Sequence, residues 1–409
     1  MTIKSKPKLV VWCQFFYPEL ISTGQVITEL FTRLADKFEI EVYCAQPTIR
    51  KSSRVPRVIF YQGIKIVRVW SSTFPKISIL GKIINQVTYS ASLFFKALFL
   101  PKGSNVNVFT DPFFLPLLLY LLYPIKRFKY TITLFDLYPE TLSQNQVLSS
   151  CSFLYRFIDK LTNKVYANAS NVITIGRCMQ KIVTNRPINW KRKPEFIPIW
   201  CDTDNIRQKN LTENYFRDLW NITKDTFVVG YSGNLAKFHP IETFVEAAKI
   251  LSYNKDIKLI FVGEGAKKVW AQSYCEKNNL TNCHFQSYVE REQLGSLLAS
   301  FDCGLVGLNP EQTGLSVPSK TIGLMSAGVP IIACVDKLSE TALMIQENKS
   351  GYLCSPKDPR KLAELILKLK DNPKEREFLR NNAIHAVESD FHIQQIVESY
   401  SEILRSQPT

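Results

Sequence analysis

Residues 227–241 of this chain read FVVGYSGNLAKFHPI. The apolar run Phe227–Tyr231 is typical of a buried strand, and the apolar spacing from Ile241 onward predicts a helix. Between them lies a glycine turn, Ser232-Gly233-Asn234, and Pro240 suits the first turn of the helix. A strand, a glycine turn and a helix in this order form the repeating unit of parallel α/β sheets.

The same unit recurs on both sides of this stretch. We therefore predict an α/β protein with two Rossmann-like parallel-sheet domains that face each other across a cleft, with ligands at the carboxyl ends of the strands. We place the domains at residues 1–205 and 206–390, followed by a final helix within 391–409. The other predicted strands are Lys8–Cys13, Glu39–Ala45, Lys65–Val69, Val106–Thr110, Tyr130–Leu134, Asn171–Ile175, Phe196–Trp200, Lys258–Val262, Cys283–Phe285, Cys303–Val306 and Ile331–Ala333.

The composition is that of a globular protein whose charge is unevenly distributed. Residues 1–210 hold 29 Lys/Arg and 12 Asp/Glu, a net charge of +17, whereas residues 211–409 hold 22 and 24, a net charge of −2. The first half is thus expected to attract anionic lipid, nucleic acid or a phosphorylated substrate, unless it is simply a basic, soluble surface. No run of 18 apolar residues and no signal-peptide pattern is found, so we expect a cytoplasmic protein.

Cysteine and histidine usage argues against a metal site. The ten cysteines include no Cys-x-x-Cys pair and fall mostly in apolar runs, which indicates buried, reduced thiols. The four histidines are dispersed. The D-x-D sequence Asp202-Thr203-Asp204 can bind a divalent cation beside a nucleotide sugar, but its position at the domain junction favours a turn.

Two turns outside residues 227–241 could bind an anion. In the first, Ser22 or Thr23 is expected to cap a helix over Gln25–Lys37, and Gly24 would let a phosphate approach the backbone. In the second, Pro318-Ser319-Lys320 places a hydroxyl and an ammonium at a helix start, which suits an anionic leaving group. A plain capped helix remains the alternative for each turn.

Two apolar segments are interrupted by lysine. Ile77–Leu100 contains Lys82 and Lys96, and Leu117–Tyr123 is followed by a basic stretch at residues 126–129. Each could be an ordinary core helix or an interfacial contact with a membrane, since an apolar face bordered by Lys and Arg suits both.

The motifs in their order resemble the retaining glycosyltransferase family 4, which has the GT-B fold, and more narrowly the bacterial transferases of colanic-acid, O-antigen and capsule synthesis. The resemblance covers nearly the whole chain. It rests on Tyr17-Pro18-Glu19 with Thr23-Gly24, Asp136-Leu137-Tyr138-Pro139-Glu140, Ile197–Asp204, Tyr231–Leu235, Val262–Gly265, Val317–Lys320 and Ser326–Pro330.

This resemblance implies a UDP- or GDP-linked sugar on the second domain, an acceptor on the first, and no metal. It also implies that the final helix crosses back onto the first domain. The acceptor would be a polyprenyl-diphosphate-linked saccharide or another polysaccharide precursor, and the protein would be peripheral on the inner face of the plasma membrane. The implied catalytic residues are Lys320, Ser319, Lys237 and Asp136, and the implied donor-binding residues are Gly24, Ser232, Gly233, Asn234, Gly263, Glu264, Gly265 and Val289.

The chain departs from the family pattern at two places. Leu315 and Gly323 occupy the positions of the Glu-x7-Glu carboxylates, and Asn234 and His239 replace an Arg and a Lys, for which Lys237 could substitute. A degenerate, non-catalytic scaffold therefore remains an alternative, and so does a GT-B nucleotide-sugar epimerase, which would need no lipid acceptor. A nucleic-acid-binding protein is disfavoured because no recognisable module is found and the aromatic residues lie in apolar runs.

Overall fold

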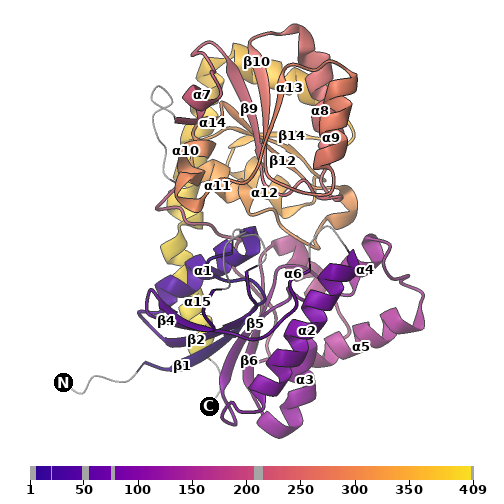
Figure 1. The fold of residues 1–409 in the computed structure, drawn as a ribbon, viewed down its shortest axis with the longest axis vertical. Coiled ribbons are helices and arrows are strands. Elements are labelled where there is room, and N and C mark those ends of the chain that lie inside the picture. Colours follow the sequence, from indigo (N-terminus) through magenta and orange to yellow (C-terminus); the bar gives the residue numbers. More distant parts are fainter. Residues whose placement is uncertain (1–5, 20, 48–54, 75–78, 207–214, 407–409) are drawn as a thin grey trace, which may run out of the picture. The chain divides into compact units, whose positions relative to one another are not determined.

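The computed structural model describes residues 6–19, 21–47, 55–74, 79–206 and 215–406. The chain divides into two compact units. The first unit comprises Met1–Pro198, Gly314–Ser316 and Gln394–Thr409, and the second comprises Ile199–Thr313 and Val317–Ile393. Each unit is built on its own sheet (Figure 1).

The first unit contains a sheet of eight described strands in the order β3-β4-β2-β1-β5-β6-β7-β8. The strands pair in parallel, except that β3 is antiparallel to β4. Its strands are β1 (Lys8–Trp12), β2 (Glu39–Cys44), β3 (Val58–Tyr61), β4 (Ile64–Arg68), β5 (Asn105–Phe109), β6 (Lys129–Leu134), β7 (Asn171–Thr174) and β8 (Glu195–Phe196). Its helices are α1 (Ser22–Leu34), α2 (Ile79–Ala97), α3 (Phe114–Lys126), α4 (Glu140–Gln144), α5 (Phe153–Asn168), α6 (Arg177–Thr184) and, apart from its first residue, α15 (Ile393–Arg405).

The second unit contains a six-stranded parallel sheet in the order β11-β10-β9-β12-β13-β14. Its strands are β9 (Phe227–Ser232), β10 (Ile257–Val262), β11 (Cys283–Gln286), β12 (Cys303–Gly307), β13 (Ile331–Cys334) and β14 (Gly351–Cys354). Its helices are α7 (Tyr215–Leu219), α8 (Ile241–Ile250), α9 (Lys268–Lys277), α10 (Leu294–Leu298), α11 (Lys320–Ser326), α12 (Glu340–Glu347), α13 (Pro359–Asp371) and α14 (Pro373–Ala386). Helices α8 and α9 lie on one face of the sheet, and α11 and α14 lie on the other (Figure 1).

The predicted α/β class with two parallel-sheet domains is confirmed. Several local predictions are wrong. The strand predicted at Phe196–Trp200 is reduced to the two residues of β8, and the strands β3 and β14 were not anticipated. Helix α1 begins at Ser22 with Ile21 as its capping residue, so neither Ser22 nor Thr23 is the N-cap.

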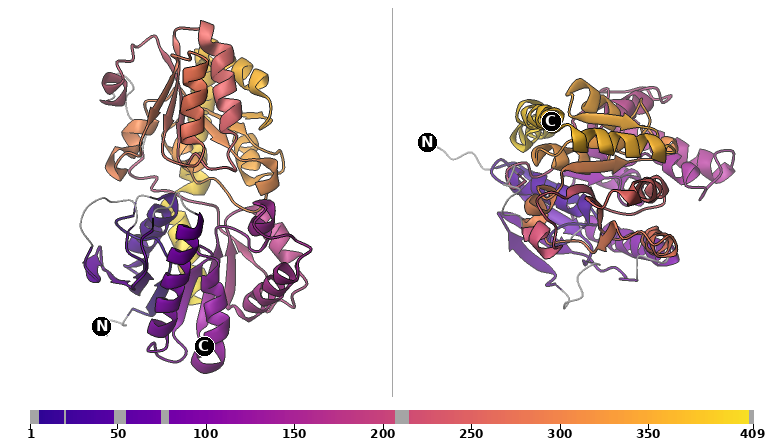
Figure 2. Two further views of the ribbon diagram at one scale, coloured as in Figure 1. Left: turned by 45° about the vertical axis from the view of Figure 1, so that its right-hand side comes forward. Right: turned by 90° about the horizontal axis from the view of Figure 1, so that it is seen from above.

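Helix α15 packs on the sheet of the first unit through polar as well as apolar contacts (Figure 2). The Tyr400 hydroxyl is 3.1 Å from the Thr133 hydroxyl on β6, and the Asn171 amide on β7 donates to the Ile403 carbonyl at 3.1 Å. Tyr400 is fully buried. The last helix of the chain therefore packs on β6 and β7 as part of the first unit.

Replacing Tyr400 tests how much α15 stabilises this unit. We expect Tyr400→Ala to lower the free energy of unfolding by about 3 kcal/mol, because it opens a cavity in the core. Tyr400→Phe should cost about 1 kcal/mol, since it keeps the ring and removes the hydroxyl that contacts Thr133. Chemical denaturation of the full chain measures both, with the exposed Glu402→Ala as control. Equal effects of the three variants would show that α15 is not part of the core.

Candidate functional site

The carboxyl ends of the strands in the second unit carry most of the predicted site residues. The chain runs from β9 to β10 and β11 on one side, and then returns to place β12 on the other side of β9. Ligands of open parallel sheets bind at such a reversal of strand order. The turn after β9 contains Gly233, and the segment that follows β12 leads to Lys320 at the start of α11.

The turns after β9 and β10 are held together by their backbones. The Gly233 N–H donates to the Val262 carbonyl, and the Leu235 N–H donates to the Glu264 carbonyl, both at 2.9 Å. Gly263 has a φ of +146°, and a Cβ there would lie 2.0 Å from the Gly233 oxygen. Only glycine fits this approach. The two predicted glycine turns thus form one surface, with an internal packing reason for Gly263.

Lys320 lies against this surface. Its Nζ is buried and has no hydrogen-bond partner among the described residues. The ammonium lies 3.8 Å from the centre of the Tyr231 ring, and it is 2.9 Å from where a Cβ of Gly233 would stand. Burial lowers the pKa of Lys320 to about 7, because removal from water disfavours the charged form. A buried cation without an acceptor is poised to bind an anion.

His239 is the other polar side chain buried beside this turn. Its Nδ1 lies 2.5 Å from the Gly307 carbonyl at the end of β12. Burial, and then the neighbouring Lys320, hold the pKa of His239 well below its usual value. The imidazole is therefore neutral at physiological pH and joins two loops of the sheet, whereas Lys237 and Asn234 in the same turn are exposed.

The remaining predicted residues of the second unit line the border of this surface. Ser319 is half-buried and precedes α11, but its side chain does not cap that helix. Glu264 is exposed and pairs with Lys268 at 2.7 Å. Although partial burial opposes it, hydrogen bonds from Lys268 and Ser287 lower the pKa of Glu264. Ser232 and Val289 are half-buried at the ends of β9 and beyond β11.

The predicted site residues of the first unit also lie beyond the carboxyl ends of strands. Gly24 is buried within α1, where a Cβ would stand 3.2 Å from the Cβ of Phe15. Asp136 follows β6, and its N–H donates to the Thr110 hydroxyl at 3.2 Å. Burial, and then the neighbouring Asp111, raise the pKa of Asp136 to about 7.

Sequence reasoning missed Asp111 and Tyr231. Asp111 stands two residues beyond β5, which is the neighbour of β6 in the sheet, so its position after a strand was the available signal. Tyr231 lies in β9 and reads as an ordinary core residue, because nothing in its local sequence shows that Lys320 covers its ring.

The two aspartates of the D-x-D sequence make separate local contacts. The Asp202 carboxylate is buried and accepts hydrogen bonds from Asn205 at 2.6 Å and from Arg291 at 3.1 Å. Asp204 pairs with His392 at 3.2 Å. These contacts fit a turn that joins neighbouring segments of the second unit. In the described part of the chain, no group of three His, Cys, Asp or Glu side chains is arranged to hold a metal ion.

Leu315 and Gly323, which occupy the positions of the two missing glutamates, are packed against other parts of the protein. Gly323 lies inside α11, where a Cβ would be 3.3 Å from the Leu298 side chain. Leu315 is buried and belongs to the first unit. The contacts that two glutamates would make to a ligand therefore have no counterpart at either position.

Comparison with known proteins agrees with this geometry. The two-unit architecture is the GT-B fold, and it is shared by three solved structures at TM-scores between 0.71 and 0.77. Sucrose-phosphate synthase from Thermosynechococcus elongatus has a TM-score of 0.77 at 17% identity, covering 98% of each chain. Anabaena Alr3699/HepE in complex with UDP and glucose has 0.74 at 16%, covering 98% of this chain and 100% of that one. WaaG, a glycosyltransferase involved in lipopolysaccharide biosynthesis, has 0.71 at 14%, covering 97% and 100%.

The match to a family model falls on the second unit, and a curated relative matches a longer part of the chain. Residues 213–386 match the family model described as glycosyl transferases group 1. The chain is also 28% identical over 257 residues to a probable glycosyltransferase, WbjE of Pseudomonas aeruginosa. That match spans 61% of this chain and 63% of the relative. The domain and the relative together support a transferase enzyme.

Because the ammonium of Lys320 is buried without a hydrogen-bond partner among the described residues, we expect its removal to raise the stability of the fold. Folding lowers its pKa from 10.5 to about 7, so the group destabilises the fold at low pH, and this cost fades as the pH rises toward 10.5. We expect Lys320→Met to raise the free energy of unfolding by roughly 2 kcal/mol at pH 6 and by less at pH 9. Urea denaturation at both pH values measures the difference, and a loss of stability at pH 6 would contradict it.

Proposed function

We propose that this chain is a glycosyltransferase that moves a sugar from a nucleotide-sugar donor to a saccharide acceptor in the synthesis of a cell-surface polysaccharide. One observation carries this proposal. The buried, unpartnered Nζ of Lys320 lies at the Gly233 turn, beside the strand-order reversal of a domain that matches glycosyl transferases group 1. This is where an anionic diphosphate would find an uncompensated cation.

In this proposal, Lys320 stabilises the departing nucleotide diphosphate. Cleavage of the sugar–phosphate bond leaves negative charge on the diphosphate, and a preorganised cation in a dry site stabilises that charge more in the transition state than before it. Ser319 would add a hydrogen bond, and Lys237 would supply a second, solvated cation. Gly233 lets the diphosphate approach Lys320, because a side chain there would meet the ammonium.

The base of the donor would lie over the joined turns after β9 and β10, near Glu264 and the segment Ser287–Val289. We propose a UDP- or GDP-linked sugar. The structure of HepE is a complex with UDP and glucose, and the likeness in fold supports a nucleotide-sugar donor for this chain. The sequence similarity to the glycosyltransferase family 4 motifs supports the same assignment.

The first unit would bind the acceptor. Asp136 has a pKa of about 7, so near neutral pH part of it is ionised and can accept a hydrogen bond from the acceptor hydroxyl. We expect the sugar to be transferred with retention, through attack of the acceptor hydroxyl on the face that the diphosphate leaves, with the leaving phosphate accepting the proton.

We further propose that the reaction needs no metal ion. The Asp202 carboxylate, which a D-x-D metal site would use, is engaged by Arg291 and Asn205. The ammonium of Lys320 would neutralise charge on the diphosphate instead. If the reaction needs no metal ion, EDTA should leave the transferase activity intact.

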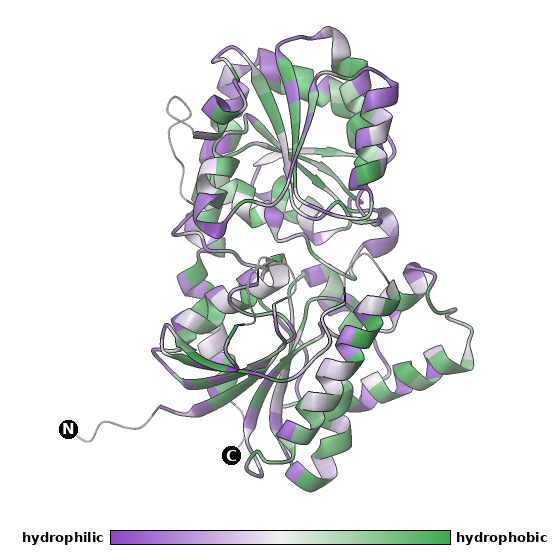
Figure 3. Cartoon of the chain, in the orientation of Figure 1, coloured by the Kyte–Doolittle hydropathy of each residue, from purple (hydrophilic) through white to green (hydrophobic). Residues whose placement is uncertain are grey.

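An anionic membrane is the proposed location of the acceptor. Helices α2, α3 and α5 form one layer of the basic first unit, with hydrophobic residues along their lengths (Figure 3). On α2, the outward residues Leu80, Ile83, Val87 and Phe95 follow a helical spacing, and Leu80 and Phe95 are 66% and 64% exposed. Exposed lysines, among them Lys82 and Lys96, border this stripe. No helix in the described ranges is long and apolar enough to cross a membrane, so contact would be interfacial.

Replacing Lys320 tests the catalytic proposal. Lys320→Met should lower kcat by about 10²-fold, with a smaller change in KM for the donor, because the cation acts mainly on the transition state. The measurement is transfer from a panel of UDP- and GDP-sugars to a polyprenyl-diphosphate-linked saccharide, with and without EDTA. The matched control is Lys277→Met, an exposed lysine at the end of α9.

Other outcomes separate the alternatives. A change in KM alone would make Lys320 a binding residue, and no change would favour a non-catalytic scaffold. An epimerase would release an isomeric nucleotide sugar when no acceptor is present.

Vesicle binding tests the proposed membrane contact. Replacing Leu80 and Phe95 with serine should weaken binding to vesicles that contain anionic lipid by about 10-fold or more, because both side chains lose apolar burial. Raising the salt concentration should weaken the binding of the unchanged chain, since its lysines are screened. The matched control replaces Tyr253 and Val269, which are 91% and 73% exposed on the second unit. Equal losses in both pairs would reject this surface.

A further inference from the structure

Tyr231 makes two contacts that together enclose the Gly233 turn. Its ring lies 3.8 Å below the ammonium of Lys320, and its hydroxyl donates to the Asn234 carbonyl at 2.7 Å. The side chain is fully buried in β9. Burial, and then Tyr288, raise the pKa of the Tyr231 hydroxyl well above its usual value, so it remains a neutral donor.

The other charged or titratable groups around Lys320 do not compensate its charge. His239, in the turn after β9, is neutral because burial and Lys320 lower its pKa. Lys267, just before α9, is occupied by the Glu242 carboxylate and by the His239 carbonyl, both at 2.7 Å. Within the part of the chain that the structure describes, the Nζ of Lys320 has no hydrogen-bond acceptor. The ammonium is instead attracted by the negative face of the Tyr231 ring.

We propose that Tyr231 is a positioning residue whose ring keeps Lys320 charged and directed at the Gly233 turn until a diphosphate arrives. The identity of the ligand rests on the proposed function, whereas the pairing of ring and ammonium does not. The aromatic face stabilises a buried cation without donating or accepting a hydrogen bond. Below about pH 7, an incoming diphosphate therefore meets an ammonium that is already charged and has no acceptor to release.

The proposal has a consequence that depends on pH. Without the ring, the charged form of Lys320 loses stabilisation, so its pKa falls further below 7. A diphosphate binds the charged form, and above that pKa the protein must first take up a proton. The loss of affinity should therefore grow as the pH rises, whereas a loss caused only by altered packing would be similar at each pH.

Two substitutions separate the ring from the hydroxyl. Tyr231→Phe keeps the ring and loses only the bond to Asn234, whereas Tyr231→Leu removes the ring. With UDP and GDP as probes in isothermal titration calorimetry, we expect the phenylalanine variant to follow the pH profile of the unchanged chain. The leucine variant should bind about 2-fold more weakly at pH 6 and about 10-fold more weakly at pH 8, for a fall of about one unit in the pKa of Lys320.

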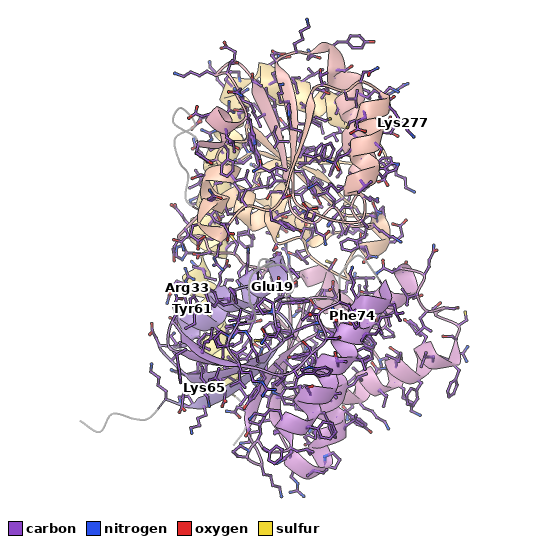
Figure 4. The ribbon with its side chains drawn as sticks, viewed as in Figure 1. Glu19, Arg33, Tyr61, Lys65, Phe74 and Lys277 are labelled. Atoms are coloured by element: carbon purple, nitrogen blue, oxygen red, sulfur yellow. The ribbon has the colours of Figure 1, made fainter. Side chains whose placement is uncertain are left out.

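A second measurement needs no ligand. Titration of isotope-labelled lysine side chains by NMR in the empty protein should show a lower pKa for Lys320 in the leucine variant, but not in the phenylalanine variant. Lys277, which projects from α9 into solvent, provides the reference signal (Figure 4). It should be the same in all three proteins, and a cooperative thermal unfolding transition in each variant shows that the variant is folded.

The outcomes distinguish this proposal from the proposed function. An unchanged Lys320 titration in Tyr231→Leu, or a loss of affinity that does not vary with pH, would overturn the role of Tyr231. A phenylalanine variant that behaves like the leucine variant would also overturn it, because the hydroxyl would then be the cause. If the unchanged chain binds neither UDP nor GDP while Lys320 titrates as expected, the proposed function fails and the role of the ring stands.

Discussion

The close approach of the two glycine turns in the second unit determines the rest of its candidate site. Backbone hydrogen bonds join the turn after β9 to the turn after β10, and no side chain fits at Gly263, because a Cβ would overlap the Gly233 oxygen. The joined turns form a rigid surface beside the strand-order reversal. Lys320 closes this surface from the far side of β9, so the position of the ammonium follows from backbone packing rather than from a hydrogen bond of its own.

The buried ammonium of Lys320 lowers the stability of the fold but serves the proposed function. A lysine that is buried without an acceptor disfavours folding, yet the same absence of an acceptor leaves its charge available to a ligand. Tyr231 reduces the cost through its ring, and the neutral His239 avoids adding a second positive charge beside Lys320. The buried apolar core around β9, β10 and β12 supplies the stability that such a site requires.

The first unit shows a comparable division of tasks. Helix α15 contacts its sheet through Tyr400 and Asn171, so the last helix of the chain stabilises β6 and β7, which lie more than 200 residues earlier in the sequence. On the layer made by α2, α3 and α5, apolar side chains such as Leu80 and Phe95 remain exposed among lysines. At the carboxyl ends of the strands, two carboxyl groups lie close enough for Asp111 to raise the pKa of Asp136. The large positive charge of this half therefore coexists with a local acidic site.

Local patterns in the sequence determined the class of fold and many of the residues that meet at the site. Buried strands, glycine turns and the lysine at Pro318-Ser319-Lys320 are visible from spacing alone, because strand and helix periods are set by nearby residues. Short-range signals failed where neighbours in space decide. Ile21 precedes α1 in place of the expected Ser22 or Thr23 cap, and the two-residue β8 is limited by its pairing with β7.

Only the tertiary structure decided which of these residues touch. The order of strands brings β9 beside both β10 and β12, and this order depends on contacts between segments that are far apart in the sequence. Nothing near Tyr231 indicates that a lysine 89 residues later covers its ring, nor does the sequence around Asp136 point to Asp111. The sequence by itself determined the chemical groups and the turns that carry them. The tertiary structure decided how deeply these groups are buried, and burial shifts their pKa values. Burial cannot be read from local sequence, because it depends on all the segments that pack around a group.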